Sequence, residues 1–175
     1  YHLITRNERL DSIAKDIVHH FLNRGYQGKA MVISIDKLTA VKMHTKVKHE
    51  WDAETARVGK LLEEMNPNYE DYPALTERYD NLTRTDMAVI VSPGQNEISE
   101  MAKHGLDMRP HRERIVKEDL ETEFKKTGND FRIAFVCSMW LTGFDAPDCS
   151  TLYLDKPMRG HTPMQTIARA NRAEC

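Results

Sequence analysis

The chain has 175 residues, of which 40% are hydrophobic and 30% charged, and its formal net charge is −2 at pH 7. This length suffices for one domain with its own core, and the composition is ordinary for a soluble globular protein. No apolar run approaches the roughly 18 residues of a transmembrane helix, so we expect a protein that does not cross a membrane.

The first half of the chain predicts helix, strand and long helix. An apolar face with i, i+3, i+4, i+7 spacing predicts a helix that ends near Gly25; its residues are Leu10, Ile13, Ala14, Ile17, Val18, Phe21 and Leu22. Residues 30–35 are a continuous apolar run typical of a buried strand. Asp36 is placed to cap a long helix over about residues 38–65. Residues 66–86 have weak periodicity, and the polar stretch at about 50–86 is predicted as a helical insertion.

The second half alternates strands with helices. Buried strands are predicted at 87–91, 131–137 and 151–155, and helices at 111–126 and about 163–171. Such alternation predicts an α/β fold with a mostly parallel sheet and helices on both faces. Ligands bind outside the carboxyl ends of the strands in such sheets. That rule directs attention to residues 36–37, 92–95, 138–147 and 156–162.

A first candidate site lies directly after the third predicted strand. Thr142 and Gly143 would let backbone N–H groups approach a phosphate, because glycine lacks an obstructing Cβ. Asp145 could orient water, a ribose hydroxyl or an arginine. The alternative is an ordinary turn in which Gly143 takes positive φ and Asp145 caps the next element. Trp140, in the same loop, could stack on a base, but we expect it to fill the core.

A second candidate site lies on the last predicted helix. Gln165, Arg169 and Arg172 stand at i, i+4 and i+7 and so share one helix face. Convergent guanidinium groups suit phosphate oxygens, whose charge spreads during phosphoryl transfer. Two alternatives compete: Thr162 and Gln165 form a capping box, and the arginines could be a solvated face.

Together the two sites resemble a known family. The order Thr142-Gly143-x-Asp145, a further strand, then Gln165-x-x-x-Arg169-x-x-Arg172 is similar to motifs V and VI of superfamily 2 helicase-like ATPases. Residues 131–172, with Leu-Asp-Lys-Pro-Met at 154–158 and Ile-Ala-Arg-Ala-Asn-Arg at 167–172, resemble the restriction (R) subunits of type I restriction-modification enzymes. Residues 87–98, 105–107 and 110–114 are similar to the same family.

The resemblance implies that residues 1–175 are a single RecA-like motor lobe, the second (helicase C-terminal) lobe, with a three-layer fold, within a larger multidomain chain. ATP and Mg²⁺ would lie between it and a first lobe that holds most of the nucleotide contacts. Arg172 and Arg169 would be arginine fingers, and Gln165 would sense the nucleotide.

The remaining implied roles concern the nucleotide and the DNA. Gly143 and Asp145 would border the nucleotide, and Thr142 would contact DNA phosphate. Lys37, at a strand end matching the motif IV position, would also bind DNA. The implied partners are double-stranded DNA, the first lobe, and the modification and specificity subunits, in the cytoplasm. The parent would be an ATP-dependent type I site-specific deoxyribonuclease that translocates DNA before cleaving it.

The sequence lacks several motifs that a complete enzyme of this kind would contain. No Walker A loop is present, since Gly-Tyr-Gln-Gly-Lys at 25–29 has the wrong spacing and precedes a strand. No Pro-Asp…Glu-x-Lys nuclease core is visible, so we expect this fragment alone to be inactive. The eight histidines lack ligand-forming spacings, and no metal site is predicted. Ala168 replaces the glycine that many superfamily members have before the first arginine.

The charge distribution leaves other functions open. Residues 50–130 carry eleven Lys/Arg against nineteen Asp/Glu, whereas residues 1–49 carry nine against four. A protein held on DNA by electrostatics alone would show a basic excess, so DNA contacts must be few and local. The alternatives are the second lobe of another superfamily 2 helicase or translocase, and a non-catalytic α/β adaptor that binds an anionic partner.

Overall fold

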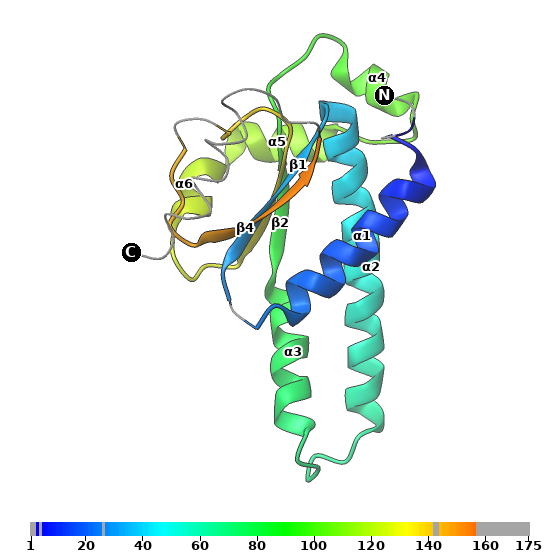
Figure 1. Cartoon of the computed structure of the whole chain (residues 1–175), viewed down its shortest axis with the longest axis vertical. Coiled ribbons are helices and arrows are strands. Elements are labelled where there is room, and N and C mark those ends of the chain that lie inside the picture. The colour runs from blue at the N-terminus through cyan, green and yellow to red at the C-terminus, as the bar shows by residue number, and fades with distance from the viewer. Residues whose placement is uncertain (1–2, 4, 26, 142–143, 157–175) are drawn as a thin grey trace.

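A single parallel sheet organises the protein (Figure 1). The computed structural model describes residues 3, 5–25, 27–141 and 144–156. Its four strands lie in the order β2-β3-β1-β4, and all neighbouring pairs are parallel. They are β1 (Lys29–Ser34), β2 (Asp86–Ile90), β3 (Phe131–Val136) and β4 (Cys149–Asp155). The predicted parallel α/β sheet is confirmed, and each predicted strand overlaps an observed one.

Helices cover both faces of this sheet. On one face lie α1 (Asn7–Asn23) and α2 (Lys37–Glu64), and α2 pairs with α3 (Tyr72–Arg84). On the other face lies α6 (Leu120–Lys125), while α5 (Arg109–Lys117) runs beside the edge strand β2 and α4 (Glu97–Ala102) stands near its end (Figure 1). The architecture is that of a RecA-like three-layer sandwich.

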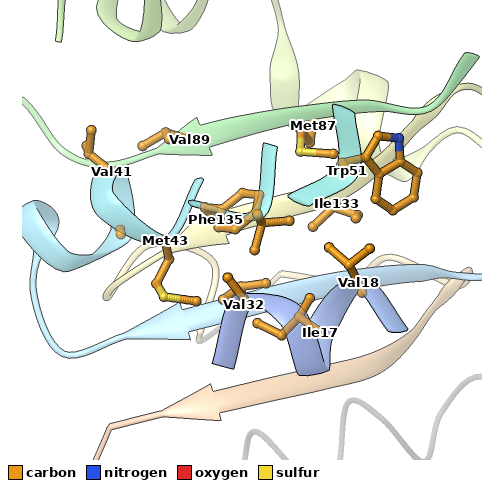
Figure 2. Close-up of a cluster of buried hydrophobic side chains, with 14 of the residues drawn as sticks. Ile17, Val18, Val32, Val41, Met43, Trp51, Met87, Val89, Ile133 and Phe135 are labelled. Atoms are coloured by element: carbon orange, nitrogen blue, oxygen red, sulfur yellow. The ribbon is translucent and has the colours of Figure 1, made fainter. Parts of the chain in front are cut away.

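Successive side chains of a strand point to opposite faces of the sheet, and this produces two hydrophobic cores, one on each face. Val32, Ile133 and Phe135 point toward α1 and α2, where they meet Ile17 and Met43 (Figure 2). The intervening strand residues form the second core with α6 and the loop after β3; they include Met31, Ile33, Ala134 and Val136. Because both faces of each inner strand are buried, these strands appear in the sequence as unbroken apolar runs.

The polar insertion is a helical hairpin. Helix α2 has 28 residues, which makes it about 42 Å long, and together with α3 it extends past the sheet (Figure 1). The indole Nε1 of Trp51 donates to the Leu82 carbonyl at 2.9 Å, which ties the two helices together at the level of the sheet. Farther out, Gly59 lets Tyr79 approach closely, since a Cβ there would lie 3.0 Å from the tyrosine ring.

Local signals explain where most elements begin and end. The Asp36 carboxylate accepts from the Thr39 N–H at 2.7 Å, so the predicted cap of α2 is confirmed. Gly25, with φ +81°, follows α1 as predicted.

The prediction of one helix over 111–126 is wrong. The chain is extended at Glu118, and the Asp119 side chain accepts from the Thr122 N–H at 3.1 Å to start a new helix, α6. Helix α4 was not expected from the sequence. The predicted helix at 163–171 lies outside the described residues.

Candidate functional site

The carboxyl ends of all four strands meet at one edge of the sheet, because the strands are parallel. Four connecting segments therefore begin there: residues 35–37 after β1, 91–96 after β2, 137–141 after β3, and Lys156 after β4. The rule on ligand binding had directed attention to parts of these segments. We call this region the carboxyl edge.

Lys37 joins the segments after β1 and β2. It is the first residue of α2, and its Nζ donates to the Pro93 carbonyl at 3.1 Å. The bond uses one of its three N–H donors and leaves the ammonium group on the exposed side of the edge. Lys37 is thus positioned at the carboxyl edge as predicted, although its proposed contact with DNA is not tested by this geometry.

A largely buried ion pair supports the segment after β2. The guanidinium of Arg112 holds Glu97 through two bonds, Nε to Oε1 at 2.6 Å and Nη2 to Oε2 at 2.8 Å, with both side chains less than 20% exposed. Arg112 also donates to the carbonyls of Val91 and Ser92, each at 3.2 Å. The hydrogen bonds from Arg112 to the Glu97 carboxylate hold the pKa of this carboxyl group below its ordinary value. The pair fixes the path of the chain as it leaves β2.

A second ion pair closes the edge beside β4. Arg9 of α1 donates to Oδ1 of Asp155 at 2.5 Å, and Asp155 is 7% exposed. Its Oδ2, and the hydroxyl of Ser34 on the neighbouring strand, are buried without a hydrogen-bond partner among the described residues. Lys156 donates to the Cys137 carbonyl at 2.9 Å, which links the ends of β4 and β3.

The segment after β3 is anchored by aromatic side chains. Trp140 and Phe144 are both buried, and both lie close to Phe124 of α6. The expectation that Trp140 fills the core is confirmed. Asp145 directly follows this anchor and is exposed, and it forms no hydrogen bond or ion pair with another described residue. It lies on the return of the chain to the amino end of β4, because the carbonyl of the next residue, Ala146, accepts from the Cys149 N–H at 2.9 Å at the start of that strand.

The remaining predicted site residues are not described by the structure. Thr142, Gly143, Gln165, Arg169 and Arg172 lie outside the described residues. The predicted convergence of the two arginines with the glycine at 143 therefore stays a prediction.

No pattern in the sequence predicted a site role for Arg9, Glu97, Arg112 or Asp155. Arg9 and Asp155 are 146 positions apart, so no local pattern could have paired them. Glu97 and Arg112 lie in two different helices, and neither carries a spacing signal of its own.

Chemically, this edge offers the ammonium group of Lys37, which keeps two N–H donors for a ligand, beside a segment that Arg112 holds in place. Among the described residues, no group of three His, Cys, Asp or Glu side chains could hold a metal ion. None of the described helices is long and apolar enough to cross a membrane.

Comparison with known proteins gives consistent matches. Residues 26–174 match the family model described as type I restriction enzyme subunit R domain 3. The chain is 31% identical, over 97% of its length, to the type I restriction enzyme HindI endonuclease subunit of Haemophilus influenzae. It is 30% identical, again over 97% of its length, to the putative type I restriction enzyme MjaIXP endonuclease subunit of Methanocaldococcus jannaschii. It spans 14% and 13% of these two relatives.

Proposed function

The chain belongs to the family of type I restriction enzyme subunit R domain 3, and from this membership we propose that it is the second motor lobe of an ATP-dependent double-stranded-DNA translocase within a type I restriction endonuclease. In this proposal the lobe couples ATP hydrolysis to DNA translocation before cleavage. The matching relatives are endonuclease subunits about seven times longer than this chain, so the activity belongs to the larger parent.

The observation that carries the proposal is the position of Lys37 at the carboxyl edge, where parallel α/β sheets bind ligands. Its ammonium group donates to the Pro93 carbonyl and keeps two further N–H donors, which suit a phosphate oxygen. The bonds of Arg112 to the carbonyls of Val91 and Ser92 hold the neighbouring segment in place.

ATP and Mg²⁺ would bind between this lobe and a first lobe of the parent. We assign the arginine-finger role to Arg169 and Arg172, and nucleotide contacts to Gly143, Asp145 and Gln165. Thr142 and Lys37 would contact DNA phosphates. Further partners would be the modification and specificity subunits.

The test uses the full parent subunit. Arg172→Ala and Arg169→Ala should each reduce DNA-stimulated ATP hydrolysis by roughly 10³-fold or more, because an arginine finger contributes about that much to phosphoryl transfer. Duplex DNA binding should change less than tenfold. Arg57→Ala, an exposed arginine in the outer part of α2, twenty positions along that helix from Lys37, is the matched control and should retain full activity.

The opposite result has a clear meaning. Hydrolysis that survives both substitutions refutes the finger assignment and favours a non-catalytic adaptor. Strand separation by the parent would instead identify a helicase, whereas movement along intact duplex followed by distant cleavage supports the restriction enzyme.

A further inference from the structure

A pocket of about 280 Å³ lies at the opposite, amino end of the sheet, away from the carboxyl edge. It forms where the end of α1, the turn before β1, and α3 come together at the lower end of the sheet in Figure 1. The lining residues are Phe21, Leu22, Gly25, Gln27, Ala74, Glu77, Arg78, Asn81 and Arg132. We call it the amino-end pocket. Its polar groups are predominantly hydrogen-bond donors.

An irregularity in the sheet directs Arg132 into this pocket. Phe131 pairs with Asp86 and Ile133 pairs with Met87, so Arg132 is an extra residue with no partner on β2. Such bulges re-aim a side chain, and they occur often beside functional sites. Here the guanidinium carbon of Arg132 lies 4.8 Å from the centre of the Phe21 ring, on the α1 side of the sheet.

The positive charge of Arg132 is not neutralised within the described part of the chain. Its Nη2 donates to the Gly28 carbonyl at 3.3 Å, and no described carboxylate lies within ion-pair distance of the guanidinium. Arg24 also contacts Phe21, with its guanidinium carbon 3.8 Å from the ring centre. Burial, and then the charge of Arg24, lower the pKa of Arg132 to about 10, against the attraction of Asp130. Two cations thus share a partly buried space.

The acidic side chains near the pocket either already form ion pairs with other arginines or are exposed to solvent. Asp130 accepts from Arg84 at 3.0 Å, and Glu54 accepts from Arg78 at 2.9 Å. Glu77 lines the pocket but is exposed and forms no ion pair among the described residues. The positive charge of Arg132 therefore favours the binding of an anion close to its guanidinium group.

We propose that the amino-end pocket binds a compact phosphate group, held by Arg132 and Arg78 with the side-chain amides of Gln27 and Asn81. These donors come from β3, α3 and the turn before β1, so they approach from several directions. A tetrahedral phosphate can accept from all of them, whereas a planar carboxylate accepts mainly in one plane. The small volume and the exposed acids on α3 disfavour a long polyanion. This site is separate from the proposed motor function.

Isothermal titration of the chain with inorganic phosphate, at constant ionic strength, tests the proposal. Binding should be saturable, and Arg132→Gln should weaken it about tenfold or more, as expected for one lost charged hydrogen bond. Arg109→Gln removes an exposed arginine elsewhere and should leave the affinity unchanged. Phosphate should also raise the Tm of the wild type. Absence of saturable binding overturns the proposal.

A second variant covers the case in which Arg132→Gln fails to fold. Gln27→Glu places a carboxylate of equal size at the pocket. This carboxylate should compete with phosphate for Arg132 and repel it, so the phosphate affinity should fall about tenfold or more. Gln95→Glu makes the same change near the carboxyl edge and should have no effect. Unchanged phosphate affinity in Gln27→Glu overturns the proposal.

Parallel titrations identify the source of the phosphate. Acetate, ATP and a short DNA duplex are compared with inorganic phosphate in the wild type and in Arg132→Gln. Arg132-dependent binding of free phosphate or ATP supports a small ligand, and Arg132-dependent binding of the duplex alone places the phosphate on DNA. Acetate binding as tight as phosphate refutes phosphate as the ligand.

Discussion

The indole ring of Trp140 lies flat against the ring of Phe144, with 4.5 Å between the ring centres and 2° between the planes. The two residues bracket positions 142 and 143 in the chain. Phe124 of α6 lies 5.5 Å from the Trp140 ring and 6.1 Å from the Phe144 ring. Trp140 adopts φ +65°, a conformation that bulky residues rarely take. The stacking on Phe144 therefore holds Trp140 in a conformation that its own backbone would disfavour.

Replacing Phe144 with alanine should destabilise the protein by about 3 kcal/mol, because it removes a buried ring and the stacking partner of Trp140. In the parent subunit we also expect a lower rate of DNA-stimulated ATP hydrolysis. Urea unfolding followed by circular dichroism measures the first effect. Tyr69→Ala, at a position 63% exposed, is the control. A loss below about 1 kcal/mol would show that the stacked pair does not anchor the segment.

Lys29→Met should also destabilise the protein, by roughly 2–4 kcal/mol. Lys29 is 2% exposed, and burial lowers the pKa of its ammonium group. Its Nζ donates to the carbonyls of Phe124 and Lys126, at 2.7 and 2.6 Å, and to Oδ1 of Asn129 at 2.7 Å. Methionine fills the space but leaves these acceptors at the end of α6 without a donor.

The measurement for Lys29→Met is again urea unfolding, with Lys117→Met as control because Lys117 is an exposed lysine of α5. If the two variants are equally stable, the buried ammonium group contributes nothing beyond packing.

Acidification should weaken the fold through His44. Burial, and then the charge of His111, lower the pKa of His44 to about 4; Lys48 and Arg114 act in the same direction, and a hydrogen bond with the backbone of Met87 opposes them. In the unfolded chain a histidine takes up its proton near pH 6.5, so protons favour the unfolded state below that pH. Stability should therefore fall by roughly 3 kcal/mol between pH 7 and pH 4 and then level off.

His44→Gln should flatten this part of the pH profile when unfolding free energies are measured at pH 7.5 and 4.5. The ring of His111 lies 4.7 Å from that of His44, and burial lowers its pKa as well, so some acid sensitivity should remain. His104→Gln, at an exposed position, should behave as the wild type. A profile in His44→Gln that matches the wild type would rule out this residue as the source.

Arg112→Ala should cost roughly 2–4 kcal/mol, since it leaves the largely buried Glu97 without its bidentate partner and removes two bonds to the carbonyls after β2. Hydrogen exchange at Ser92 and Gly94 should accelerate, because the segment loses its support. Arg109→Ala, which removes an exposed arginine from the same helix, should change stability by less than about 0.5 kcal/mol. Unchanged exchange at those two amides would contradict the assigned role of Arg112.

Local patterns explain why so much of the fold could be predicted. A buried parallel strand must be apolar on both faces, so β1 and β3 are visible as uninterrupted runs in the sequence. The cap at Asp36 and the glycine at 25 act within three or four residues, and their chemistry can be recognised without knowing the fold. The break between α5 and α6 also has a local cause, the cap that Asp119 forms at the start of α6. Asp119 lies within a run of charged residues, so it was not recognised as a cap in the sequence.

The sequence by itself determined the fold class and the family, because these depend on periodicity and on motifs within short stretches. Only the tertiary structure decided that Arg9 meets Asp155, that Lys29 caps α6, and that a bulge turns Arg132 toward Phe21. Each of these contacts joins residues about 95 to 146 positions apart. Their pairing depends on strand order and register, and these are set by the packing of the whole sheet.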